Sequence, residues 1–103
     1  MQLLPLAIIH QNKIYRNHII SFKNGNLLIY PFERECEATR FISAIIIVSN
    51  KKAQQHIPDL PKIEEGYRNI AEIKTFFQNN DLYLHKKDVP TLICADTLGF
   101  KIL

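Results

Sequence analysis

The chain has 103 residues, of which 47% are hydrophobic and 22% are charged, and its formal net charge is +3. These values exclude a disordered or fibrous chain, and the length suits a single domain, residues 1–103, with one modest core. No apolar run reaches the ~20 residues that a membrane-spanning helix needs. We therefore expect a soluble domain in the cytoplasm, because two cysteines are too few for the disulfide framework of a small secreted protein.

The N-terminal part of the chain predicts short β-strands, the first of them at residues 6–10 and 13–15. The clearest local signal is Asn24-Gly25, because this pair tolerates the positive φ angles of a tight hairpin turn. The pair predicts a β-hairpin whose arms are residues 18–23 and 27–32.

The most apolar strand candidate runs from Thr39 to Val48. One face of this strand carries Phe41, Ile45 and Ile47, and the other carries Ile42, Ala44, Ile46 and Val48. A strand that is apolar on both faces lies in the middle of a sheet that is covered on both sides. The pattern therefore predicts a sandwich of two sheets, or a sheet with a helix packed on one face.

The hydrophobic period changes after Pro61. Apolar residues then recur every three or four positions, at Ile63, Tyr67, Ile70, Ile73 and Phe77. This spacing predicts one amphipathic helix at about residues 62–79, which Gly66 weakens locally. Two β-like runs follow, at residues 91–95 and 99–103. The predicted fold class is α+β, with a mostly antiparallel, partly sandwich-like sheet and one packed helix.

The spacing of histidines and cysteines predicts no metal site. The candidate ligands are His10, His18, His56, His85, Cys36 and Cys94, and none forms the closely spaced pairs that structural zinc uses. Cys94 lies in an apolar run that disfavours a reactive thiolate, so we expect it to be a small buried hydrophobe. Cys36 lies among the acidic residues Glu33, Glu35 and Glu37, which disfavour a thiolate as well. A Cys36–Cys94 disulfide stays open, although a cytoplasmic location argues against it. We predict no catalytic, cofactor-binding or metal-binding residue.

Nucleotide and nucleic-acid signatures are also missing from the sequence. Its three glycines, Gly25, Gly66 and Gly99, form neither a P-loop nor a dinucleotide fingerprint. Basic residues are dispersed along the chain, with doublets only at Lys51-Lys52 and Lys86-Lys87, as is typical of a solvated surface. An aromatic platform for single-stranded nucleic acid would use Tyr15, Tyr30, Phe32 and Phe41, but strand spacing favours core positions for them.

Residues 19–32 form an apolar run, Asn-Gly, and a second apolar run, and the strand from Thr39 to Val48 follows. This arrangement, over residues 6–50, resembles the small N-terminal β-sandwich domain of metal-dependent amidohydrolases. In that family a barrel with a His-x-His at its mouth follows the domain. Here Ser49-Asn50 stands where the family has Pro-Gly, no His-x-His follows, and the chain is too short for a barrel of about 250 residues. The resemblance implies a stand-alone relative of the accessory domain, without metal ligands or hydrolase activity.

Three functional hypotheses are open. The preferred one is a non-catalytic interaction or accessory module that binds a protein partner or itself, because sheet edges need cover. The second is a small enzyme, or an accessory enzyme subunit related to amidohydrolases, whose site would use His10, His18 or His85 near the glutamates of residues 33–37. The third is RNA binding by a sheet face with Arg16, Lys23 and Tyr30. We expect neither a membrane nor a nucleic acid as partner. An enzyme should bring several titratable groups within hydrogen-bond reach, whereas a module should leave them dispersed.

Overall fold

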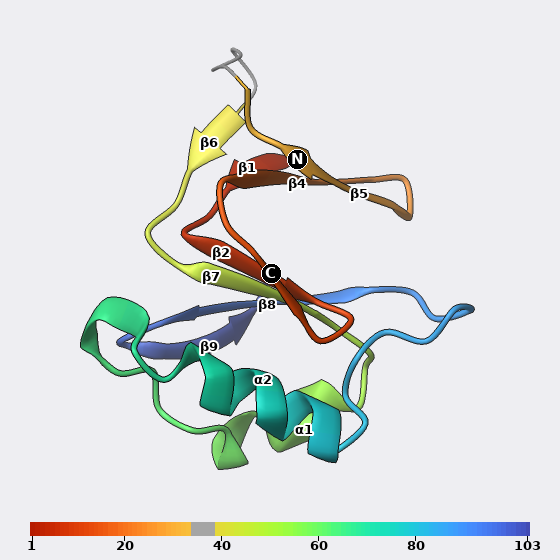
Figure 1. Cartoon of the computed structure of the whole chain (residues 1–103). Coiled ribbons are helices and arrows are strands. Elements are labelled where there is room, and N and C mark those ends of the chain that lie inside the picture. Colours follow the sequence, from red (N-terminus) through yellow and green to blue (C-terminus); the bar gives the residue numbers. More distant parts are fainter. Residues whose placement is uncertain (34–38) are drawn as a thin grey trace.

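The computed structural model describes residues 1–33 and 39–103. Two β-sheets and a layer of helical elements stack on one another (Figure 1), which confirms the predicted α+β class. The four-stranded sheet has the order β5-β4-β1-β6 and consists of β1 (Gln2–Leu4), β4 (His18–Lys23), β5 (Asn26–Pro31) and β6 (Thr39–Phe41). The five-stranded sheet has the order β3-β2-β7-β8-β9 and consists of β2 (Ala7–His10), β3 (Lys13–Tyr15), β7 (Ile45–Ser49), β8 (Thr91–Asp96) and β9 (Gly99–Ile102).

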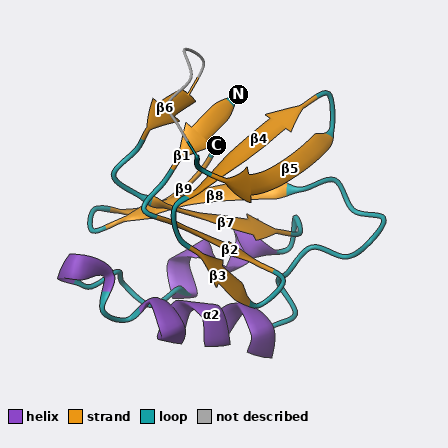
Figure 2. Cartoon of the chain, turned by 45° about the horizontal axis from the view of Figure 1, so that its top comes forward, coloured by secondary structure: helices purple, strands orange, loops and turns teal. Residues whose placement is uncertain are grey.

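Neighbouring strands are mostly antiparallel, as predicted. The antiparallel pairs are β1–β4, β2–β3, β4–β5, β7–β8 and β8–β9, whereas β1–β6 and β2–β7 are parallel. The predicted hairpin is β4–β5, which projects from the upper sheet in Figure 2. It turns at Asn24 and Gly25, whose φ angles are +54° and +80°, the positive values that a two-residue hairpin turn requires.

Two segments of the chain cross from one sheet into the other. Leu6 N donates to Ala44 O at 2.9 Å and Ile42 N donates to Leu4 O at 3.1 Å, so the two segments stay paired through the bend. The prediction of one continuous strand from Thr39 to Val48 is therefore wrong, because β6 and β7 lie in different sheets. The bend falls where Pro5 of the neighbouring segment has no N–H for a continuous ladder.

β7 is the centre of the five-stranded sheet and is covered on both faces. Ile45 and Ile47 belong to the buried cluster under the helical layer, and Ile46 and Val48 belong to the cluster between the two sheets. All four side chains are fully buried. The predicted alternation is therefore confirmed within β7, and both kinds of cover, a sheet and a helix, are present.

The helical layer differs from its prediction in where the main helix begins. Helix α2 (Ile70–Asn79) occupies only the last ten residues of the predicted range. Gly66 and Tyr67 have φ angles of +73° and +57°, which no α-helix accommodates, so a separate 3₁₀ turn, η2 (Glu65–Tyr67), precedes the helix. The layer is completed by two short elements that the hydrophobic pattern did not predict, α1 (Ala53–His56) and η1 (Ile57–Asp59).

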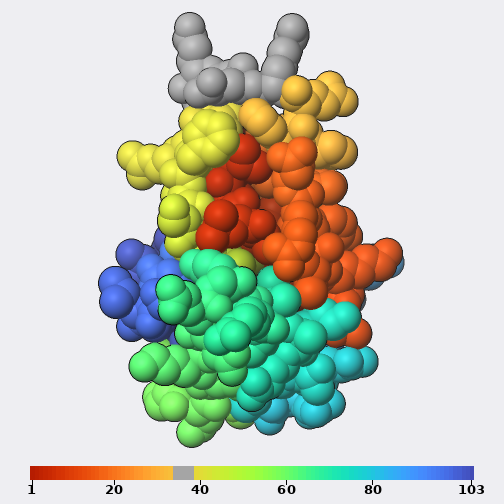
Figure 3. Space-filling view, turned by 60° about the vertical axis from the view of Figure 1, so that its left-hand side comes forward, coloured from red at the N-terminus to blue at the C-terminus, as the bar shows by residue number. Residues whose placement is uncertain are grey.

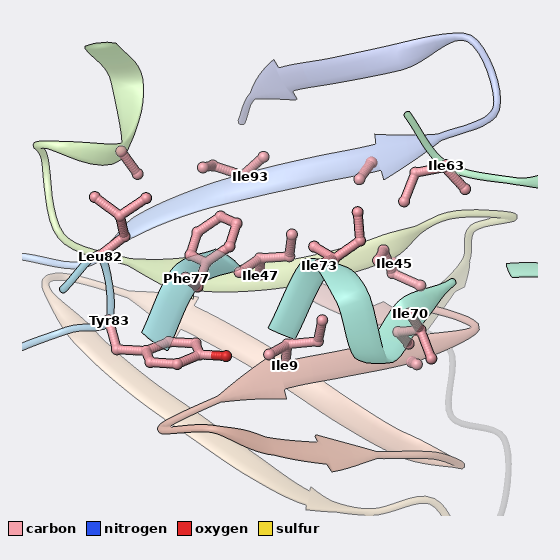
Figure 4. Close-up of a cluster of buried hydrophobic side chains, with 13 residues drawn as sticks. Ile9, Ile45, Ile47, Ile63, Ile70, Ile73, Phe77, Leu82, Tyr83 and Ile93 are labelled. Atoms are coloured by element: carbon pink, nitrogen blue, oxygen red, sulfur yellow. The ribbon is translucent and has the colours of Figure 1, made fainter. Parts of the chain in front are cut away.

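Aromatic and aliphatic side chains fix α2 on the sheet (Figure 4). Ile73 and Phe77 are fully buried in the cluster shared with β2, β7 and β8. The Phe77 and Tyr83 ring centroids lie 5.8 Å apart. The Tyr83 hydroxyl donates to Lys74 O at 2.9 Å, and burial raises the pKa of Tyr83 to about 12. Among the described residues, no helix is both long and apolar enough to span a bilayer.

A buried amide joins the end of β7 to the segment after α2. Asn50 is only 3% exposed. Its Nδ2 donates to Asp81 O at 2.9 Å and to Tyr83 O at 3.0 Å, and its Oδ1 accepts from Lys52 N at 2.9 Å. These bonds satisfy the amide away from water and fix the positions of two loops relative to each other.

Candidate functional site

The histidines that a catalytic site would need have separate surroundings. His18 is the first residue of β4, and its Nδ1 lies 2.8 Å from Arg16 O, whereas His85 Nε2 lies 3.2 Å from Asp81 Oδ1. His10 lies at the end of β2, where burial lowers its pKa. Within residues 1–33 and 39–103, no three His, Cys, Asp or Glu side chains gather closely enough to hold a metal ion. His10, His18 and His85 therefore each have different neighbours in the described part of the chain.

The predicted acidic cluster and the two cysteines add no nucleophile to the part of the chain that is described. Glu33 is exposed, whereas Glu35, Cys36 and Glu37 lie outside the described residues, and so does any Cys36–Cys94 pairing. Cys94 is 8% exposed and packs between the two sheets, where burial raises the pKa of its thiol. A thiol in this environment is a poor nucleophile at neutral pH.

The aromatic side chains proposed as a nucleic-acid platform do not share one face. Tyr15 packs against the cluster between the sheets. Phe32 and Phe41 contact each other edge-on, with ring centroids 6.0 Å apart. Lys23 and Tyr30 lie on the outer face of the four-stranded sheet, because the residues that alternate with them point into the cluster between the sheets. Tyr15 therefore shares no face with Tyr30, and the prediction of a core position is wrong for Phe41, which is 57% exposed.

Exposed apolar side chains gather where the two sheets diverge. A groove of about 460 Å³ opens between β6 and β9, and a second hollow, around Leu6 and Phe41, continues it along residues 41–43. Four large apolar residues beside these hollows are 45–57% exposed, namely Met1, Leu6, Phe41 and Leu103. Ile102 projects from the other face of β9, because its cross-strand partner Ile93 belongs to the cluster under the helical layer. Contiguous exposed apolar surface of this kind is typical of a protein interaction site.

Strand β9 is an open edge beside this groove. It pairs with β8 on one side, and the hairpin that the two strands form lies at the left edge of the face in Figure 3 (blue). Leu103 N donates to Leu92 O at 2.9 Å, and backbone direction alternates along an antiparallel strand, so Lys101 and Gly99 also face β8. The N–H and C=O groups of Phe100 and Ile102 consequently point away from the sheet. No backbone hydrogen bond found between the described elements reaches them.

Residues of both lysine doublets line a different pocket, at the carboxyl end of β7. This pocket, of about 530 Å³, is lined in part by Lys51, Lys52, His85, Lys87 and Asp88. Asp81 contacts two of these side chains, with Oδ2 3.6 Å from Lys52 Nζ and Oδ1 3.2 Å from His85 Nε2. Tertiary structure thus concentrates basic groups that are far apart in the sequence.

The candidate functional site is the face formed by β6, β9 and the groove between them, called the groove face below. Its sequence signal is Phe100-Lys101-Ile102, since a lone lysine in a short apolar strand is typical of a sheet edge. The sequence analysis predicted this strand but missed its edge position, which depends on strand order. Comparisons of the chain with protein-family models, curated proteins and solved structures found no match.

Proposed function

We propose that the protein is a non-catalytic interaction module that self-associates through the groove face. The observation that carries this proposal is the gathering of exposed apolar side chains beside an open strand edge. Burial of apolar surface contributes roughly 25 cal/mol per Å², so covering this face favours association. The dispersed histidines support a module over an enzyme. We place the module in the cytoplasm, where a free Cys94 stays reduced.

The strand that carries this proposal is an edge strand and not the most apolar strand of the chain. The most apolar strand, β7, is central and already covered on both faces, so it leaves no edge to hide. Among the edge strands β3, β5, β6 and β9, it is β9 that lies beside the groove, and the Leu103 that follows it is exposed. A second copy of the chain supplies the same open edge, and two such edges satisfy each other.

We expect light scattering after size-exclusion chromatography to give about twice the 12.0 kDa mass of the chain. Leu103→Glu should weaken the dimer at least tenfold, which corresponds to about 1.4 kcal/mol, because Leu103 lines the groove and the variant places a charge in the buried interface. Leu28→Glu is the matched control, since Leu28 is also an exposed leucine but lies on β5, away from the groove face. A protein that remains monomeric at every concentration would contradict self-association.

An accessory enzyme subunit related to amidohydrolases is the alternative proposal for the same face. In that case another chain, rather than a second copy, would cover β9, and the isolated protein would be monomeric. RNA binding through Arg16, Lys23 and Tyr30 is the remaining alternative. It requires an affinity for RNA that falls steeply with added salt, because phosphate contacts release counterions.

The pocket with the lysine doublets favours a second function, the binding of a small anion. Titration with inorganic phosphate at constant ionic strength should shift the amide resonances of residues 50–52 and 85–91 in a saturable way. Lys51→Ala and Lys87→Ala should each weaken this binding several-fold, because both side chains line the pocket. Lys23→Ala is the control, since Lys23 is exposed on β4. Shifts that do not saturate, or that are weakened equally by Lys23→Ala, would show only general charge attraction.

A further inference from the structure

We infer that two copies of the chain pair through antiparallel β9 strands in one particular register, which is centred on Phe100. This inference rests on the proposed self-association and adds the atomic basis of it. Pairing two edge strands in this way would join the five-stranded sheets of both copies into one continuous sheet. A two-fold axis perpendicular to that sheet would leave both grooves on the same side of it.

The direction of the backbone groups restricts the register. Only Phe100 and Ile102 in β9 point their N–H and C=O groups outward. In an antiparallel ladder, outward-pointing residues of one strand stand opposite outward-pointing residues of the other. Two symmetric registers meet this requirement and pair most of the residues of β9. One is centred on Phe100, and the other is centred on Lys101.

Charge separates these two registers. The register centred on Lys101 places the lysines of both copies directly opposite each other, and like charges in that position destabilise a sheet. The register centred on Phe100 instead places Lys101 opposite Gly99 of the second copy. Gly99 has no side chain, and a Cβ at this position would meet no atom within 4 Å, so the lysine chain has room to extend over it.

An acidic residue of the second copy, Asp96, lies beyond Gly99 in the direction in which Lys101 extends. Gly99 pairs with Asp96 of β8, and cross-strand partners project from the same face of a sheet. Asp96 of the second copy therefore lies two strand spacings from Lys101, roughly 9.6 Å between Cα atoms, which the two side chains together can span. Asp96 Oδ1 accepts from Leu98 N at 2.9 Å, which leaves Oδ2 to face the lysine. The two-fold axis creates this ion pair twice.

Apolar contacts on the opposite face of the strand agree with the same register. Phe100 of each copy stands opposite Phe100 of the other, beside the cluster under the helical layer that each already contacts. Ile102 comes beside the turn that precedes β9 of the second copy, and Leu98 in this turn is 95% exposed in the single chain. The register centred on Phe100 thus covers the most exposed apolar side chain of the hairpin and pairs opposite charges.

Charge variants test this register against other modes of dimerisation. Lys101→Glu should raise the dimer dissociation constant at least tenfold, because the new carboxylate faces Asp96 of the second copy. Lys101→Arg should keep wild-type affinity. Asp96→Asn should weaken the dimer several-fold and reduce its dependence on salt, while its side-chain oxygen still accepts from Leu98 N. Each dissociation constant is measured by analytical ultracentrifugation.

A disulfide trap gives a second and independent readout, in a background with Cys36→Ser and Cys94→Ala. Phe100→Cys should form a covalent dimer on oxidation, because hydrogen-bonded partners lie about 5.5 Å apart between Cα atoms, within disulfide range. Ile102→Cys is the control, because its two copies would lie roughly 14 Å apart along the strands. Wild-type dimers combined with unaltered dimerisation of Lys101→Glu, or with a covalent dimer of Ile102→Cys alone, would overturn the register and leave the proposed function intact. A wild-type protein that never dimerises would overturn both.

Discussion

Phe77→Ala should lower the free energy of unfolding by about 3–5 kcal/mol, because it removes a large buried ring and leaves a cavity. The Phe77 side chain is fully buried where α2 meets the five-stranded sheet. It also contacts the ring of Tyr83, so the substitution loosens both the helix and the segment that follows it. Urea denaturation followed by circular dichroism measures the change.

Phe76→Ala is the matched control for this effect. Phe76 is the same residue type at the next position of the same helix, so helix propensity changes equally in both variants. Its ring is only partly buried at the margin of the cluster. We expect a loss of about half as much or less, since less apolar surface returns to water. Equal losses would contradict the view that Phe77 is what holds α2 on the sheet.

Asn50→Ala should cost about 2–4 kcal/mol, because it removes three hydrogen bonds and leaves buried backbone groups without partners. The affected groups are Asp81 O, Tyr83 O and Lys52 N. Asn79→Ala is the control, because Asn79 is exposed at the end of α2, and surface changes there stay within about 0.5 kcal/mol. Both variants are compared with the wild-type protein by urea denaturation.

Asn50→Asp separates hydrogen bonding from packing at the same site. The aspartate has nearly the same shape, but an oxygen replaces the Nδ2 that donates to Asp81 O and Tyr83 O. The new carboxylate oxygen then faces the carbonyl oxygens of Asp81 and Tyr83, which also only accept hydrogen bonds, and burial removes the hydration that stabilises its charge. At neutral pH we expect this variant to be at least as unstable as Asn50→Ala. An Asn50→Asp protein of wild-type stability would show that the amide fills space without anchoring the two loops.

Elements whose signals are local were predicted correctly. Asn24-Gly25 has its own conformational preference for positive φ, so the hairpin between residues 18 and 31 followed directly from the sequence. β8 and β9 also lie where apolar runs predicted them. The alternation of β7 required cover on both faces, and both covers are present.

Errors in the prediction arose where distant parts of the chain determine local structure. The period after Pro61 continues through Ile63, Tyr67 and Ile70, yet the helix begins only at Ile70. Ile63 and Tyr67 contact the same buried cluster from non-helical backbone, so they satisfy the apolar period without being helical. Likewise, Gln2–Leu4 is too short to be recognised as a strand, and it exists because β4 and β6 pair with it.

By itself the sequence determined the fold class, the hairpin and the burial of both faces of β7, because conformational preference and apolar spacing act over a few neighbouring residues. Only tertiary structure decided that β9 is an edge, that the sheets diverge beside it, and that Lys51, Lys52 and Lys87 line one pocket. These features depend on strand order and on which loops meet, and long-range pairing such as Ser49 with Tyr83 sets both. A local sequence pattern therefore could not predict the candidate interface, because the interface depends on strand order and on contacts between distant loops.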